Sequence, residues 1–238
     1  DLFEGLFARA ALATDVELFD DFPSKYHVHA RRHHRWVRGD WQLLPWLWPI
    51  VPNAKREYYR NPISAIGRWK LFDNLRRSLV APTIFLLLCY AWAFVPASAA
   101  LWTIFALLII AFPVYANVAQ AFLIPPRGVS DTSHVRGVGR DMLMMSKQAV
   151  LTICLPPHQT LVMLDAIGTT LYRVYISRKH LLEWEAAYYA EQRLSSSYRS
   201  FFREMWPCLL LTALALGNCL LFNPKSLVFS APIFLIWF

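Results

Sequence analysis

A dense group of histidines and arginines carries most of the chemistry that this sequence offers. Its members, within twelve residues, are His27, His29, Arg31, Arg32, His33, His34, Arg35 and Arg38. A metal site is disfavoured, because successive histidines point apart on a helix and no nearby carboxylate or cysteine completes a ligand set. Three interpretations remain: a nucleic-acid patch, an anion site built on arginine forks, and a basic surface beside anionic lipid. Composition alone favours the last.

The elements around this cluster predict a small cytosolic domain over residues 1–78. Apolar side chains at positions 2, 3, 6, 7 and 10 predict a helix over Leu2–Leu12, which Asp1 would cap. Alternation over Thr14–Phe22 predicts a short strand that ends at Pro23. A basic amphipathic helix over Ala65–Ser78 then leads into the membrane.

The next part of the chain is too apolar for a soluble domain. The chain is 56% hydrophobic and only 17% charged, and residues 78–126 contain no Asp, Glu, Lys or Arg. Since one span needs roughly 20 residues, this stretch predicts a transmembrane hairpin over 79–125. Its helices would be Leu79–Val95 and Ala99–Phe122, with a kink at Pro113. The basic flanks Arg76, Arg77 and Arg127 place both ends in the cytoplasm; a tightly folded soluble core is the alternative.

A second hairpin is expected over 206–238, with one helix at Trp206–Phe222 and another beginning at Leu227. Residues 126–205 between the hairpins are expected to form cytosolic or interfacial amphipathic helices. Gln148–Leu164 is uncharged, but Pro156 and Pro157 remove two backbone donors, which favours an interfacial or re-entrant position over a span. Helical spacing from Leu161 to Val174 predicts an amphipathic helix, on the membrane surface or packed on the cytosolic domain. The four cysteines, all in apolar stretches, are expected to be small buried side chains: Cys89, Cys154, Cys208 and Cys219.

Several motifs then point to a family. Arg32-His33-His34-Arg35-Trp36 matches the (Q/R)xxRW motif of processive membrane glycosyltransferases of the cellulose-synthase type, and Asp1 stands 31 residues before Arg32. The segments DLFEGLFARAALATDVELFDDFP, RWVRGDWQLLPWL, RWKLFDNLRRSLVAP and PPHQTLVMLDAI resemble the glycosyltransferase region of bacterial cyclic β-1,2-glucan synthases. The resemblance implies a mainly α membrane protein fragment: the C-terminal edge of a GT-A-like α/β domain, then interfacial helices and transmembrane hairpins.

The same resemblance assigns roles to individual residues. Asp1 would be the general base that takes the proton of the acceptor hydroxyl. Arg32 and Arg35 would hold the diphosphate or orient the acceptor-site helix, and Trp36 would stack on glucose. His33 and His34 receive no role, and Asp40, Trp41 and Gln42 are weaker candidates on the same helix.

The resemblance also implies the partners of the site. UDP-glucose would be the donor, with Mg²⁺ or Mn²⁺ held by residues outside this chain, so that the chain alone would be inactive. The partners would be the bilayer of a bacterial inner membrane, the growing glucan and the other domains of the same polypeptide, without nucleic acid. Both ends of the chain look cut from a longer one. The tyrosines that could carry the glucan are Tyr58, Tyr59, Tyr172, Tyr175, Tyr188 and Tyr189.

Two other functions stay open. One is a linear-glucan or cellulose-type synthase, which would share the (Q/R)xxRW motif. The other is a transporter fragment without enzymatic activity, although the expected spans carry no ionisable path. A glucan channel would instead use aromatic and amide groups such as Trp102, Asn117 and Gln120.

Overall fold

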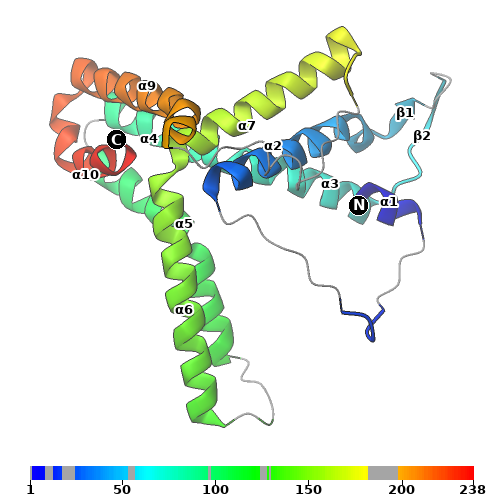
Figure 1. The fold of residues 1–238 in the computed structure, drawn as a ribbon, viewed down its shortest axis with the longest axis horizontal. Coiled ribbons are helices and arrows are strands. Elements are labelled where there is room, and N and C mark those ends of the chain that lie inside the picture. The colour runs from blue at the N-terminus through cyan, green and yellow to red at the C-terminus, as the bar shows by residue number, and fades with distance from the viewer. Residues whose placement is uncertain are drawn as a thin grey trace. The chain divides into compact units, whose positions relative to one another are not determined.

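The computed structural model is mainly helical and divides into two compact units. One contains Asp1–Pro82 and Thr160–Met205, and the other contains Thr83–Gln159 and Trp206–Phe238. The structure describes residues 2–8, 13–17, 25–52, 57–95, 98–123, 128, 130–181 and 198–238. The two units are considered separately, and their elements are labelled in Figure 1.

The first unit is built on three helices: α2 (Tyr26–Gln42), α3 (Ala65–Ser78) and the part of α7 (Pro156–Leu171) that follows residue 159. Shorter elements accompany them: α1 (Leu2–Phe7), the 3-10 helix η1 (Leu44–Leu47), strands β1 (Ile50–Pro52) and β2 (Tyr58–Arg60), and the π-helical turn η3 (Tyr172–Ser177). The strands pair antiparallel with Val51 opposite Tyr59. Among the described residues this two-stranded pair is the whole of the sheet structure, so the edge of a GT-A-like domain is not seen.

Two predictions for the start of the chain need comment. The predicted helix is confirmed over Leu2–Phe7, while its remainder from residue 9 and its cap Asp1 lie outside the described residues. The strand predicted over Thr14–Phe22 is wrong where it can be seen. Residues 14 and 15 form a turn, and residues 13–17 are all exposed. The alternating apolar side chains of this segment therefore do not form the buried face of a strand. Residues 18–22 lie outside the described part.

One face of α7 packs against α2. Val37 of α2 is buried against Met163, Ala166 and Ile167 of α7, with exposed fractions of 2% for Val37 and 0% for Ala166. Of the predicted apolar stripe, Ile167 and Leu171 belong to this cluster, whereas Leu164 is 47% exposed. His34 also contacts Asp165 of α7, with 2.9 Å between Nε2 and Oδ2.

The helix α3 owes its position to both its ends and its buried stripe. The Ser64 side chain accepts a hydrogen bond from the Gly67 N–H at 3.1 Å and caps the N-terminus. Gly67, Leu71, Leu75 and Ser78 then recur at i, i+4, i+8 and i+11 on the buried side. A side chain at Gly67 would meet the Ile63 methyl group at 2.6 Å and Leu6 of α1 at 3.0 Å, so glycine permits the close approach of α1.

Enlarging Ala166 tests the packing of α7 on α2. We expect Ala166→Leu to lower the free energy of unfolding by about 1 to 3 kcal/mol, because the added methyl groups have no space beside Val37. The control is Leu164→Ala, which shortens a side chain that is 47% exposed on the same helix. Thermal unfolding of the purified protein in detergent measures both, and an unchanged midpoint for Ala166→Leu would contradict the packing.

The second unit holds the apolar helices α4 (Val80–Phe94, from Thr83), α5 (Ala99–Leu123), α6 (Asp131–Cys154), α9 (Tyr198–Phe222, from Trp206) and α10 (Leu227–Trp237), with the 3-10 turn η4 (Pro224–Ser226) before α10. Aromatic rings form its centre: Trp92 lies 5.0 Å from Phe234 and 5.7 Å from Trp237 between ring centroids. Cys208 and Cys219 are buried, Cys89 and Cys154 are half-buried, and all four are free, as the sequence predicted.

Two helices are long and apolar enough to cross a membrane, and up to four crossings result if two bent helix pairs each count as one. The two are Ala99–Leu123 and Phe201–Phe222, which confirms the helices predicted at Ala99–Phe122 and Trp206–Phe222. The helix expected at Leu79–Val95 is present as α4, but it is long and apolar enough to cross a membrane only if α3 and α4 count as one bent span. The helix α5 continues through Pro113, and α10 is shorter than a span. This composition indicates a membrane protein.

The helix α6 lies within residues 126–205, where amphipathic helices were predicted, but its bounds were not. It runs antiparallel beside α5 over most of its length in Figure 1. Its apolar pattern is obscured by five charged residues and by Gly137 and Gly139. Ser130, a residue type that is common at the N-cap of a helix, was the sequence feature that could have indicated its start. The Ser130 side chain accepts a hydrogen bond from the Ser133 N–H at 3.4 Å.

A tryptophan resolves the backbone problem that the two prolines create. The helix α6 ends at Cys154 and α7 begins at Pro156. Since Pro157 has no N–H, the Ile153 carbonyl has no donor at the i+4 position. The Trp237 indole donates to this carbonyl at 2.9 Å. In the same unit, the Asn223 amide donates to the Trp92 carbonyl at 2.9 Å. Polar side chains thus satisfy carbonyls that are costly to leave unpaired in apolar surroundings.

Removing the indole N–H should therefore destabilise the second unit. We expect Trp237→Phe to lower the free energy of unfolding by about 1 to 3 kcal/mol, because the Ile153 carbonyl would be left buried without a donor. Trp206→Phe, at a side chain that is 49% exposed, is the matched control. A thiol-reactive dye in detergent would report unfolding through exposure of Cys208 and Cys219. Equal midpoints for the two variants would refute this role.

Candidate functional site

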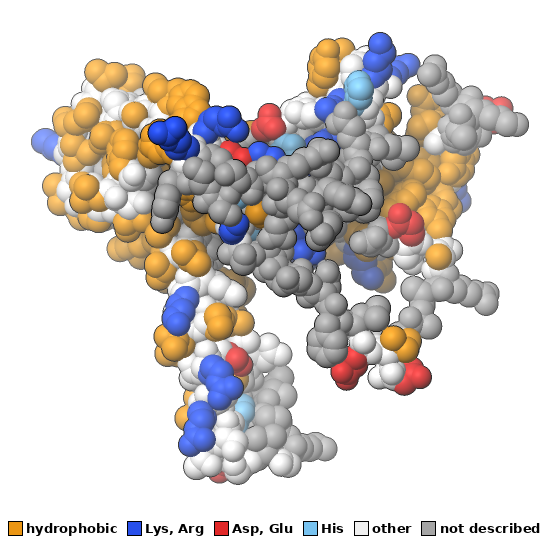
Figure 2. Space-filling model, in the orientation of Figure 1, with side chains coloured by type: hydrophobic (Ala, Val, Ile, Leu, Met, Phe, Trp, Pro, Cys, Tyr) orange, Lys and Arg blue, Asp and Glu red, His pale blue; other side chains and the backbone are white. Residues whose placement is uncertain are grey.

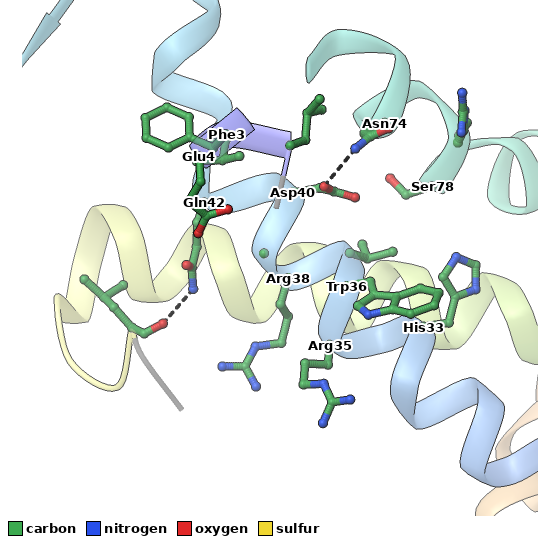
Figure 3. Close-up of a pocket in the computed structure, with 16 residues that line it drawn as sticks. Phe3, Glu4, His33, Arg35, Trp36, Arg38, Asp40, Gln42, Asn74 and Ser78 are labelled. Carbon is green, nitrogen blue, oxygen red and sulfur yellow. Dashed lines mark hydrogen bonds between the residues drawn. The ribbon is translucent and has the colours of Figure 1, made fainter. Parts of the chain in front are cut away.

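A cleft of about 800 Å³ lies along the C-terminal half of α2 in the first unit. The helix α2 lines it with six polar or aromatic side chains, and α1 and α3 contribute the others (Figure 3). Its lining includes His33, Arg35, Trp36, Arg38, Asp40, Gln42, Phe3, Glu4, Asn74, Arg77 and Ser78. The α1 side is held by Phe3, whose ring centroid lies 4.7 Å from that of Trp46 in η1.

The structure separates the residues predicted for the site. Arg35 and Trp36 line the cleft. Arg32 is not among the residues that line it; its guanidinium carbon lies 4.7 Å from the centroid of the Trp36 ring, where cation and aromatic face attract each other. Asp1, the predicted general base, lies outside the described residues. Trp36 is 49% exposed, and Arg32 covers one of its faces.

Arginines set the charge of the cleft. Arg35 and Arg38, three residues apart on α2, extend in the same direction in Figure 3, and Arg77 of α3 lies at the cleft while pairing with Asp73 at 2.5 Å. Burial, with a smaller electrostatic contribution from the neighbouring His29, lowers the pKa of His33 below its usual value of 6.5. The positive charge at neutral pH is therefore carried by guanidinium groups, whose planar forks match phosphate oxygens.

Asp40 is the acidic group of α2 in this cleft. The Asn74 amide of α3 donates to its Oδ1 at 3.1 Å (Figure 3). Burial raises the pKa of the Asp40 carboxyl, and the Asn74 hydrogen bond and the charge of Arg77 oppose this only in part. Asp40 also lies in the last turn of α2, where the helix dipole disfavours a negative charge.

The other weaker candidates on α2 hold the cleft together. The Trp41 indole donates to the Ser78 hydroxyl at 2.9 Å, and this hydroxyl in turn donates to the Leu75 carbonyl at 2.7 Å. The Gln42 amide donates to the Leu181 carbonyl at 2.8 Å. Trp41 thus joins α2 to α3, which indicates a structural role for its indole N–H.

Sequence reasoning missed the contribution of α3 to this site. Asn74, Arg77 and Ser78 all reach the cleft, and their spacing of three and four residues places them on one helix face. The spacing was visible in the RWKLFDNLRRS segment, but its approach to α2 was not. Arg38 was likewise given no role of its own, although it lines the cleft beside Arg35.

The candidates for carrying or conducting a glucan remain predictions. Tyr58, Tyr59, Tyr172 and Tyr175 are exposed in the first unit, while Tyr188 and Tyr189 lie outside the described residues. Trp102 and Asn117 are half-buried on α5, and Gln120 is exposed there.

The chain therefore has the helices of a membrane protein and a cleft lined by arginines and a tryptophan. No family model matches the chain. Over its whole length it is 37% identical, across 249 aligned residues, to the cyclic beta-(1,2)-glucan synthase NdvB of Rhizobium meliloti (strain 1021). The chain spans 8% of the length of that relative. The resemblance to cyclic β-1,2-glucan synthases that the motifs indicated is thereby confirmed.

The raised pKa of Asp40 gives a stability prediction with a definite sign. A folded-state pKa above the unfolded value means that ionising Asp40 costs folding free energy as pH rises. We expect Asp40→Asn to stabilise the protein relative to wild type at pH 7, and this difference to shrink as pH falls toward 4.

Asp73→Asn is the control of opposite sign. Hydrogen bonds from Arg76 and Arg77 lower the pKa of Asp73, so this variant should lose stability at pH 7 and approach wild type in acid. Unfolding midpoints between pH 4 and 8 measure both differences. If the difference in unfolding midpoint between Asp40→Asn and wild type does not change with pH, ionisation of Asp40 does not lower the stability of the folded protein.

Proposed function

We propose that this chain is the part of a membrane-bound glucosyltransferase that transfers glucose from UDP-glucose to a growing β-1,2-glucan. The observation that carries the proposal is the 37% identity to a cyclic β-1,2-glucan synthase over the entire chain. The cleft supports it, because two residues of the RHHRW motif, Arg35 and Trp36, lie there beside other guanidinium groups.

The proposed reaction assigns a task to each of four residues. An acceptor hydroxyl attacks the anomeric carbon of UDP-glucose, the glycosidic bond forms, the bond to UDP breaks, and a carboxylate takes the hydroxyl proton. Asp1 is the proposed carboxylate. Arg35 and Arg38 stabilise the negative charge that develops on the departing diphosphate, and the free face of Trp36 stacks on glucose.

A divalent cation and a membrane complete the proposal. Mg²⁺ or Mn²⁺, held by residues outside this chain, would neutralise diphosphate charge. The apolar helices would anchor the site at the cytoplasmic face of a bacterial inner membrane. Other domains of the same polypeptide would cyclise the glucan.

The test is incorporation of glucose from labelled UDP-glucose by the complete protein in detergent. We expect Arg35→Lys to lower the rate about 10- to 100-fold, because an ammonium group cannot reproduce the two-pronged contact with phosphate. Asp1→Asn should lower it about 10²- to 10⁴-fold if its carboxylate is the base. Arg60→Lys, at an exposed position on β2, serves as the control for loss of a guanidinium.

The product separates the remaining alternatives. β-1,2 linkages support the proposal, whereas β-1,3 or β-1,4 linkages would assign the chain to a linear-glucan or cellulose-type synthase. Absence of any incorporation by folded wild-type protein would favour the transporter interpretation and overturn the proposal.

A further inference from the structure

The carboxylate of Asp40 is placed where a carboxylate is costly. It is half-buried, it lies in the C-terminal turn of α2, and its hydrogen-bond partner is the side chain of Asn74. An asparagine at position 40 would accept the same hydrogen bond from Asn74 without bringing a charge into the cleft. The hydrogen bond between the helices therefore does not explain why the residue is an aspartate.

A ligand that uses the negative charge would explain it. A carboxylate has about four acceptor positions, and among the described residues Asn74 fills one of them. A cation is a poor candidate, because Arg35, Arg38 and Arg77 line the same cleft. Neutral hydroxyl groups suit the position better, since a charged acceptor forms stronger hydrogen bonds with them than a neutral one does.

The surroundings of Asp40 match the needs of a sugar ring. Trp36 lies four residues before Asp40, so both side chains are on the same face of α2 and both line the cleft. Asn74 adds an amide that can donate and accept next to the carboxylate. An aromatic face beside a carboxylate and an amide can bind a pyranose through its C–H face and two neighbouring hydroxyls.

We propose that Asp40 and Asn74 form a hydroxyl-binding subsite for a glucose unit of the acceptor glucan, on the α2 face that carries Trp36. The inference rests on the proposed glucosyltransferase function and adds the residues that hold the acceptor. The ionised Asp40 accepts hydrogen bonds from two sugar hydroxyls, and Asn74 fixes the orientation of its carboxylate.

The experiment measures transfer from UDP-glucose to an added β-1,2-linked glucose disaccharide by the complete protein. For Asp40→Asn, we expect the KM of the disaccharide to rise about 10- to 100-fold, since charge-assisted hydrogen bonds to the sugar are weakened. The KM of UDP-glucose should change less, and the melting temperature at pH 7 should equal or exceed that of wild type. Asn74→Ala should raise the disaccharide KM in the same direction. Asp15→Asn, at an exposed position that does not line the cleft, is the charge-matched control.

Each result bears on one proposal or the other. An unchanged disaccharide KM in Asp40→Asn overturns the subsite, and so does a variant with a lower melting temperature and equal losses for donor and acceptor. If wild type transfers no glucose, the proposed function fails. Saturation-transfer NMR with the same disaccharide then tests the subsite directly: binding by wild type that Asp40→Asn weakens supports it, and absence of binding by wild type overturns it.

Discussion

The rotation of α2 about its axis is the constraint on which the cleft depends. This helix carries eight histidine and arginine side chains in twelve residues, and successive side chains on a helix are separated by about 100°. Burial of Val37 against Met163, Ala166 and Ile167 selects one rotation. With Val37 turned to α7, Trp36 and Asp40 line the cleft together, and His34 meets Asp165. The Trp41 hydrogen bond to Ser78 then fixes the distance to α3, which supplies Asn74 and Arg77.

In the second unit, hydrogen bonds from side chains satisfy backbone carbonyls in apolar surroundings. Its helices α4, α5 and α10 are apolar, so a backbone carbonyl that a proline or a helix end leaves unpaired there needs a donor from a side chain. Trp237 donates to the Ile153 carbonyl and Asn223 to the Trp92 carbonyl, while the Trp92 indole donates to the Thr103 hydroxyl at 2.8 Å, which in turn donates to the Ala99 carbonyl. The aromatic rings at the centre of this unit thus both fill space and complete the backbone hydrogen bonding.

What could be predicted from the sequence follows from the range of each interaction. The long apolar helices were predictable because a run without charges is a local property; α5 agrees closely with its prediction, while α9 ends at Phe222 as predicted but begins at Tyr198, before the apolar run. The bounds of α6 could not be predicted, because its two glycines and scattered charges weaken the local pattern and its contacts are with the distant helix α5. The strand expected at Thr14–Phe22 failed because alternation predicts a strand only where one face is buried. The contact of Val37 with Ala166 and Ile167 of α7 could not be predicted, because it joins segments more than 120 residues apart in sequence.

The site shows the same division between local and distant information. Arg35 and Trp36 were identified through a motif, which needs no knowledge of the fold. The pair formed by Asp40 and Asn74 spans 34 residues, and nothing in either segment alone indicates that the two side chains meet. Its cost is visible only in the structure, where burial and the C-terminal end of α2 both oppose the negative charge of Asp40. Natural sequences break such local rules most often at functional positions. The buried contacts of Val37 supply stability to the same helix, so α2 can carry an unfavourable group in its last turn and remain folded.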